Sequence, residues 1–184
     1  APEGRYAGFI WAANNAHLTA TYALPRLLIV NNTAPPSVVS LTYDFKRGIN
    51  WFSLPIKPST LRVEELFKSF RGVEVYAWDP SVRRLVRVEE LEVGRAYMLR
   101  TPMAFKLTIH GLPVEELEVG LRRGLNFIGA PYGSSVSFET EPRTVLLIWE
   151  WRDGRWVRVE GFTPGGAYRV VALRACRLYL QASP

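Results

Sequence analysis

Apolar and polar residues alternate with a period of two along most of the chain, as in strands that bury one face. Turn-forming residues interrupt this alternation about every 8–12 residues, a spacing typical of β-sandwiches and barrels. We therefore expect an all-β, sandwich- or barrel-like fold. The expected strands are 5–13, 17–24, 26–31, 37–45, 48–55, 73–78, 84–89, 95–100, 104–110, 114–121, 124–130, 144–151, 155–160, 166–172 and 175–181.

One segment departs from the strand pattern. Leu61, Leu66 and Phe70 can face inward from a short helix, and Ser59 or Thr60 precedes them. Hydroxyl side chains in that position commonly cap a helix N-terminus. The segment predicts one short helix near residues 60–70, capped by one of the hydroxyls, with the three apolar residues facing inward.

Two stretches of the chain recur. Residues 47–55 reappear as 123–131 at an offset of 76, and residues 78–109 reappear as 149–180 at an offset of 71. Asn50 and Asn126 occupy matching positions, so we expect both side chains to bond backbone in equivalent turns. The expected organisation is an N-terminal strand segment, 1–45, followed by two related β-modules, 46–121 and 122–184.

The duplicated positions resemble a β-module of secreted and cell-surface prokaryotic proteins. The first copy carries the resemblance in Gly48–Pro55, Trp78 and Leu91–Leu99, and the second in Gly124–Pro131, Trp149 and Thr163–Val170. The module's pattern is G-W-N-L-[IV]-[SG]-x-P, then a Trp-bearing hairpin, then P-G-x-[AG]-Y-W-V. The chain departs from it at Ile49 and Leu125, where the pattern prefers Trp. The resemblance implies an extracellular β-module without catalysis.

The stretch Trp151–Trp156 contains Asp153-Gly154 and predicts a hairpin with a two-residue type I′ turn. Trp151 then faces Trp156, and Arg152 faces Arg155. Strand alternation gathers an aromatic face from Trp149, Trp151, Trp156 and Arg158. Such a face can stack on sugar rings or bases, or it can be a sheet surface held together by cross-strand aromatic pairs.

The N-terminal residues Tyr6–Pro25 carry no formal charge, and Tyr6–Ala13 is apolar on both alternating faces. A strand of this kind must be covered on both sides, because exposed it would aggregate. It can complete its own module, or it can be donated to a neighbouring subunit. Donation is head-to-tail and builds a filament. The residues expected to fill the acceptor pockets are Tyr6, Phe9, Ile10 and Trp11.

The amino-acid composition indicates the kind of organism and compartment in which we expect the protein. Apolar residues make up 48% of the 184 residues and charged residues 22%, with a net charge of +6 that comes from 19 Arg and 4 Lys against 17 acids. Abundant charge with few thermolabile side chains favours a thermophilic prokaryote, an archaeon above others. The start at Ala1 fits signal-peptide cleavage or a removed tag, and Asn31 begins a glycosylation sequon. We expect a secreted protein with a solvated Arg/Glu surface, and nucleic-acid binding is disfavoured because the arginines are dispersed.

Candidate chemistry is sparse. The single cysteine, Cys176, aligns with Phe105 of the first copy and predicts a core side chain. We expect no metal site, no cofactor and no enzyme, because catalytic motifs are absent and adjacent glutamates in strands point to opposite faces. The leading hypothesis is a structural subunit of an extracellular filament, pilus or surface layer, forming a head-to-tail homopolymer. The alternatives are a glycan-binding or adhesion module and a virion coat or decoration protein.

Overall fold

The computed structural model describes residues 9–13, 19–23 and 37–183, and the chain divides into two units, Ala1–Pro36 and Ser37–Pro184. In the first unit, β1 (Phe9–Ala13) pairs antiparallel with β2 (Thr19–Ala23), with Phe9 opposite Ala23 and Ala13 opposite Thr19. These two strands form a two-stranded sheet of their own. Tyr6, Asn31 and the expected strand 26–31 lie outside the described residues.

The first half of Ser37–Pro184 is a β-sandwich, the first sandwich. One sheet has the order β3 (Val39–Phe45), β9 (Phe105–Pro113) and β5 (Ile56–Pro58), and the other has the order β4 (Gly48–Ser53), β8 (Ala96–Thr101), β6 (Glu74–Asp79) and β7 (Arg84–Arg87). Phe45 and Ile109 of the three-stranded sheet share a core with Phe52, Tyr97 and Leu99 of the four-stranded sheet. Their burial on alternating positions explains the period of two in the sequence.

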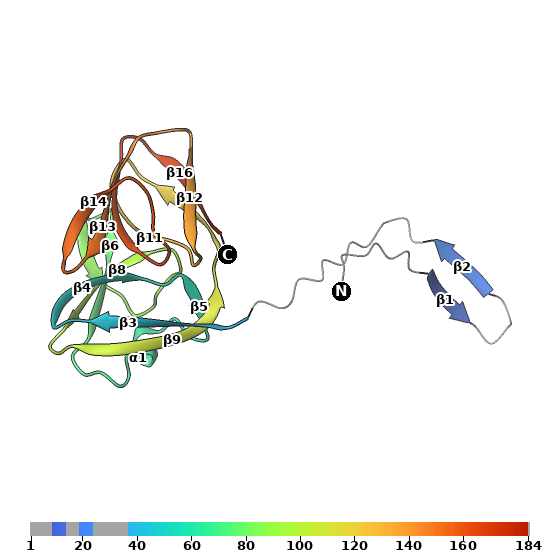
Figure 1. Ribbon diagram of the computed structural model, residues 1–184, viewed down its shortest axis with the longest axis horizontal. Coiled ribbons are helices and arrows are strands. Elements are labelled where there is room, and N and C mark those ends of the chain that lie inside the picture. The colour runs from blue at the N-terminus through green and yellow to red at the C-terminus, as the bar shows by residue number, and fades with distance from the viewer. Residues whose placement is uncertain (1–8, 14–18, 24–36, 184) are drawn as a thin grey trace. The chain divides into compact units, whose positions relative to one another are not determined.

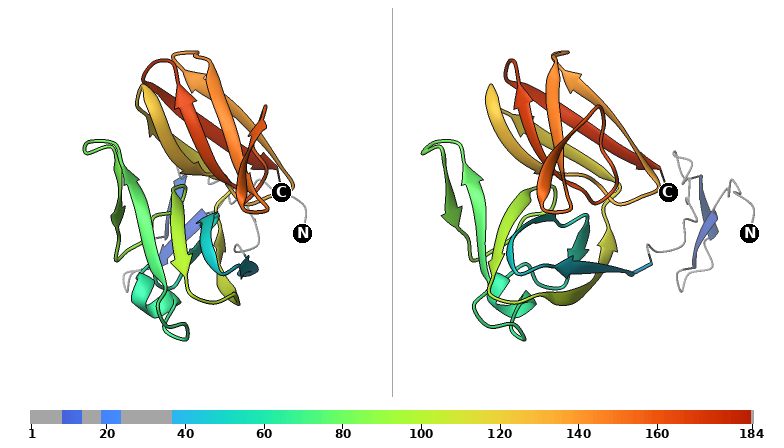
Figure 2. Two further views of the ribbon diagram at one scale, coloured as in Figure 1. Left: turned by 90° about the vertical axis from the view of Figure 1, so that its left-hand side faces the viewer. Right: turned by 60° about the vertical axis from the view of Figure 1, so that its left-hand side comes forward.

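The second half repeats this arrangement as the second sandwich (Figure 1). Its sheets have the orders β10 (Glu116–Leu121), β16 (Cys176–Ser183), β12 (Ser135–Glu141) and β11 (Gly124–Gly129), β15 (Ala167–Ala172), β13 (Leu146–Arg152), β14 (Arg155–Val159). Each strand of the first sandwich thus has a counterpart in the same place. Figure 2 shows the orange and red strands of the second sandwich standing above the cyan and green strands of the first. The expected all-β, sandwich-like fold is confirmed.

Strand pairing refines the repeat. β3 lies within the range 1–45 that the sequence predicted as an N-terminal segment, yet it pairs along its whole length with β9 of the first sandwich. Between β6 and β13 the expected offset of 71 is wrong. Trp78 lies opposite Leu85 while Trp151 lies opposite Trp156, so Trp78 corresponds to Trp151 and not to Trp149. The loop after β6 is two residues longer than the turn after β13, which moves the alignment.

Asparagine side chains close the same turn in both sandwiches, as predicted. Asn50 accepts from the Lys46 amide at 2.9 Å and donates to its carbonyl at 2.7 Å. Asn126 does the same with Arg122 at 3.0 and 2.8 Å. Both asparagines are buried, so each bond replaces water at a backbone group that would otherwise be unpaired.

A second repeated bond comes from a buried tyrosine. The Tyr97 hydroxyl accepts from the Glu92 amide at 2.6 Å, and the Tyr168 hydroxyl accepts from the Thr163 amide in the same way. Both side chains are fully buried, and each ties its strand to the loop that leads into it. The recurrent tyrosine of the two copies therefore has a structural role.

The helix and some strands differ from expectation. α1 spans Val63–Leu66, and its N-cap is Arg62 without a side-chain bond, so the predicted hydroxyl cap is wrong. Leu61 and Leu66 are half-buried against the core and Phe70 stacks on Phe105, but the fully buried residue of the segment is Phe67. No helix among the described residues is long and apolar enough to cross a membrane. β5 was not among the expected strands, since Pro58 interrupts the pattern there, whereas β12 lies within residues 134–143, for which the sequence predicts a strand and a loop.

We expect Asn50→Ala and Asn126→Ala each to lower the free energy of unfolding by about 1–3 kcal/mol, because each leaves a backbone amide and a carbonyl without partners. Urea denaturation followed by circular dichroism measures this. Ser137→Ala is the control, since its hydroxyl is exposed and makes one long bond of 3.3 Å to the Gln181 carbonyl. An equal loss of unfolding free energy in the control would show that the asparagine side chains contribute no more to stability than an exposed hydroxyl.

Burial raises the pKa of Tyr97 and of Tyr168 from 10.0 to about 12, and also raises that of Tyr43. A raised folded-state pKa gives stability that is complete below the unfolded-state pKa and is lost as pH rises toward the folded value. We expect unfolding free energy to fall from pH 10 to 12. Tyr97→Phe/Tyr168→Phe should flatten that fall and destabilise the protein at neutral pH; an unchanged slope would contradict the assignment.

Candidate functional site

The hairpin of β13 and β14 has the geometry that the sequence predicted. Trp151 lies opposite Trp156, and Arg152 lies opposite Arg155. Asp153 and Gly154 have φ values of 48° and 78°, the left-handed region that a type I′ turn requires at both positions. The tight turn fixes the register, and the register places the aromatic face on one side of the sheet.

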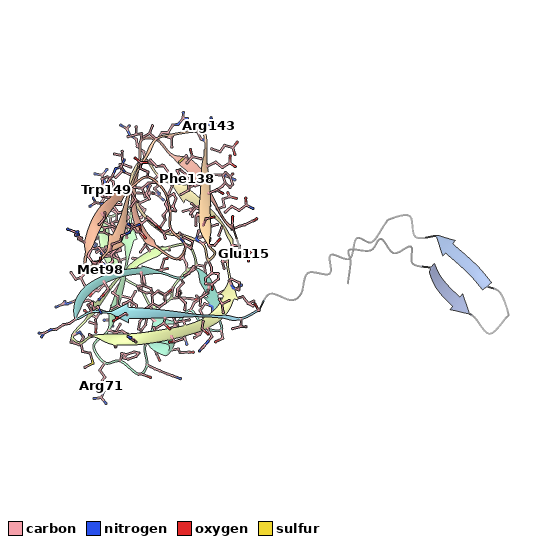
Figure 3. All side chains as sticks on the ribbon, viewed as in Figure 1. Arg71, Met98, Glu115, Phe138, Arg143 and Trp149 are labelled. Carbon is pink, nitrogen blue, oxygen red and sulfur yellow. The ribbon has the colours of Figure 1, made fainter. Side chains whose placement is uncertain are left out.

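Trp149 on that face lies between two arginines. Across the sheet it pairs with Arg169 of β15 on one side and with Arg158 of β14 on the other. The Arg169 guanidinium lies 4.5 Å from the centre of the indole ring and that of Arg158 lies 5.1 Å from it. We call these three residues the basic row. Trp149 is at the left-hand edge of the upper half of the body in Figure 3.

Trp156 lies against the junction between the two sandwiches. Its ring centre is 5.3 Å from that of Trp151, 5.1 Å from that of Trp51 and 5.8 Å from that of Phe127. Trp51 stacks on Phe127 at 4.5 Å with an interplanar angle of 11°, and Trp78 approaches the same Phe127 ring at 5.7 Å. The aromatic face thus continues into contacts that join the halves of the molecule.

Equivalent positions of the two sandwiches meet at this junction. Trp51 and Phe127 are 76 residues apart and stack, and Ser53 and Gly129 are also 76 apart and touch. A Cβ on Gly129 would lie 2.5 Å from that of Ser53, so only glycine fits there. Contacts between matched positions are the signature of an approximate two-fold axis, here within one chain.

Cation and aromatic contacts engage two of the three half-buried tryptophans of the aromatic face, Trp149 and Trp156. Two guanidinium groups occupy Trp149, while three rings and Arg169 surround Trp156. Sugar rings bind by stacking on an open aromatic face, which neither residue offers in full. The arrangement supports the reading of this face as internal packing and cross-strand pairing, with Arg158 as its exposed component.

The opposite side of the second sandwich carries a row that the sequence did not predict. Tyr179 of β16 pairs with Glu118 of β10 and with Glu139 of β12, and all three side chains point away from the core. We call these three residues the acidic row. Glu118 binds Arg177 at 3.0 Å, and Tyr179 approaches Glu141 at 3.4 Å. Strand spacing in the sequence hides such a row, because its members come from three distant segments.

Other polar candidates lie apart from any common site. The glutamate pairs 64–65, 89–90 and 115–116 are exposed, and His110 bonds Ser40 at 2.7 Å on the outer surface. Cys176 is buried as predicted, where burial raises the pKa of its thiol. Glu150 is the one buried carboxylate among the described residues, and it forms an ion pair with Arg152. Within the described part of the chain, no three metal-binding side chains gather.

Comparison with protein-family models, with curated proteins and with solved structures gives no match.

We expect Trp156→Ala to lower the free energy of unfolding more than Trp151→Ala, which should cost about 1–3 kcal/mol. The reason is that Trp156 packs on rings from both sandwiches, whereas Trp151 contacts Trp156 alone among the aromatic residues. Chemical denaturation of both variants compares them directly. Equal losses would mean that the contacts across the junction contribute little.

Proposed function

We propose that the protein is a non-enzymatic subunit of an extracellular filament or surface layer, joined to its neighbours by the N-terminal strand segment. The supporting observation is that β1 and β2 form a separate two-stranded sheet, while Ser37–Pro184 builds two sandwiches of the same strand order without them. The two sandwiches of the body are built from their own fourteen strands, β3 to β16. We infer that the N-terminal strands serve a contact with a neighbouring subunit.

The physical argument concerns what an apolar hairpin needs. A single two-stranded hairpin is marginally stable in water, and three or more strands or a packing partner stabilise it. Residues 6–13 are apolar on both alternating faces, so such a partner must cover both sides. Burial of each large apolar side chain contributes about 1.5–3 kcal/mol, against about 1–2 kcal/mol per residue for ordering the backbone. Because these energies are similar, a preformed acceptor is required.

The body offers sheet edges as acceptors. β3 has β9 as its one strand neighbour and β12 has β16, among the described strands. Each of these edges is seven residues long, enough to pair with a five-residue strand such as β1. Addition of a strand to such an edge supplies main-chain hydrogen bonds, and repeated head-to-tail addition gives an open chain of subunits.

The same proposal includes where the protein acts: outside the cell, in a thermophilic prokaryote. A secreted protein of a thermophilic prokaryote fits the sequon at Asn31 and the abundance of arginine and glutamate. Within the described body, the polar groups that could act as acids or bases are exposed and dispersed, or paired. A structural role requires none of them to act chemically.

We expect the full chain to form oligomers or fibres, and a chain that begins at Ser37 to lose them while keeping its sandwiches. Trp11→Pro in the full chain should act like the truncation, because proline removes a ladder hydrogen bond from β1. Trp11→Tyr is the matched control, since it keeps the backbone donor and a large ring. Light scattering and negative-stain microscopy measure assembly. A full chain that stays monomeric at high concentration, or a truncated chain that assembles equally well, would contradict the proposal.

A further inference from the structure

The second sandwich carries opposite charges on its two outer surfaces. The basic row, Arg169–Trp149–Arg158, lies on the four-stranded sheet, and the acidic row, Glu118–Tyr179–Glu139, lies on the three-stranded sheet. The core lies between them, since the strand neighbours of these residues point inward as Tyr168, Val170, Leu178 and Leu180. The two rows therefore face away from each other on opposite sides of one sandwich.

The rows match in geometry. Each row crosses three adjacent strands and has an aromatic residue on the middle one, flanked by two like charges. Neighbouring strands are ~4.8 Å apart, so the two charges are separated by ~10 Å in each row. A row with two cations and a row with two anions of equal spacing can oppose each other charge for charge.

The charges of both rows reach the surface, with Arg158, Glu118 and Glu139 exposed and Arg169 half-buried. Arg158 and Arg169 form no ion pair with any described residue, and the outward positions of β13, β14 and β15 hold no carboxylate. On the acidic side, four outward glutamates, at positions 116, 118, 139 and 141, face the one arginine Arg177. The cation contacts with Trp149 hold both guanidinium groups in place before any partner arrives, which reduces the entropy lost on binding.

The first sandwich has neither row, although its strands correspond. The counterparts of Arg169, Trp149 and Arg158 are Met98, Tyr76 and Arg87. Thr42 and Thr108 occupy the places of Glu118 and Tyr179, and they bond each other at 2.9 Å. Both charged rows are thus confined to the same copy, where they lie on opposite faces.

We propose that the basic row of one copy of this chain docks on the acidic row of a second copy. The contact joins two different surfaces, so it is head-to-tail and continues from copy to copy. It deepens the proposed function by adding an ionic contact between subunits that is independent of the N-terminal strands. β11 and β15 contact the first sandwich, and the Trp156 ring of β14 reaches Trp51 across the junction. Docking therefore centres on the exposed Arg158 and on the part of β13 and β14 beside it.

The experiment reverses each row in the full chain and then combines the variants. Glu118→Arg/Glu139→Arg and Arg158→Glu/Arg169→Glu should each weaken self-association by about tenfold or more, as expected for close interfacial charge pairs. A mixture of the two should restore association, because each reversed row now opposes its complement. Glu89→Arg/Glu90→Arg, on the first sandwich, is the control of equal charge change. Sedimentation velocity at rising salt measures the association of the three variants and of the mixture, and circular dichroism confirms that each variant is folded. If Arg158→Glu/Arg169→Glu misfolds, Arg158→Glu alone replaces it.

The outcomes separate this contact from strand donation. Association that falls with salt and with either reversal, and returns in the mixture, supports the rows. If removal of residues 1–36 abolishes association, but salt and both charge reversals leave it unchanged, the docking of the two rows is wrong and strand donation is retained. Association that depends on the rows but survives the truncation supports the rows and overturns strand donation. A monomeric wild type that binds an acidic polysaccharide or a nucleic acid through Arg158 and Arg169 overturns the second copy as the occupant.

Discussion

The stacking of Trp51 on Phe127, with Ser53 against Gly129 beside it, is the contact on which the body of this protein depends. Each sandwich has its own core, and the cores share no strand. What joins them is the outward face of β4 and β11, where a repeated sequence meets itself. Matched residues lie near the approximate two-fold axis, and hydrogen bonds from the Gly129 amide to the Gly94 carbonyl and from the Ser53 hydroxyl to the Gly166 carbonyl accompany this contact. Trp78 and Trp156 extend this contact on either side.

Duplication has left the framework unchanged and the surfaces different. The asparagine turns and the buried tyrosines recur with the same hydrogen bonds, since each satisfies backbone groups that burial would otherwise leave unpaired. Side chains that point away from the core do not have to satisfy buried backbone groups. The first sandwich has a threonine pair on its outer sheet, whereas the second has the two charged rows. Any assembly contact that distinguishes the halves has to use these positions.

The framework could be read from the chain because its determinants are local. Alternation of apolar residues marks the strands, and Asp153-Gly154 determines the turn that pairs Trp151 with Trp156. The repeat predicted equivalent turns at Asn50 and Asn126. Local signals also failed in identifiable places. The loop after β6 is two residues longer than its counterpart, so Trp78 matches a different residue of the second copy than the repeat predicted. The N-cap of α1 is Arg62 and not the expected Ser59 or Thr60, and the residue of this segment that packs in the core is Phe67.

By itself the sequence determined the class of fold, the duplication, the buried cysteine and the face shared by Trp149, Trp151, Trp156 and Arg158. Only the tertiary structure decided that the two copies meet through Trp51 and Phe127, and that Trp149 is held between Arg169 and Arg158. It also placed Glu118, Tyr179 and Glu139 side by side. The physical reason is that period and turn chemistry act between neighbours in the chain. The order of strands in a sheet, which decides the outward neighbours of each residue, depends on burial between segments far apart in sequence.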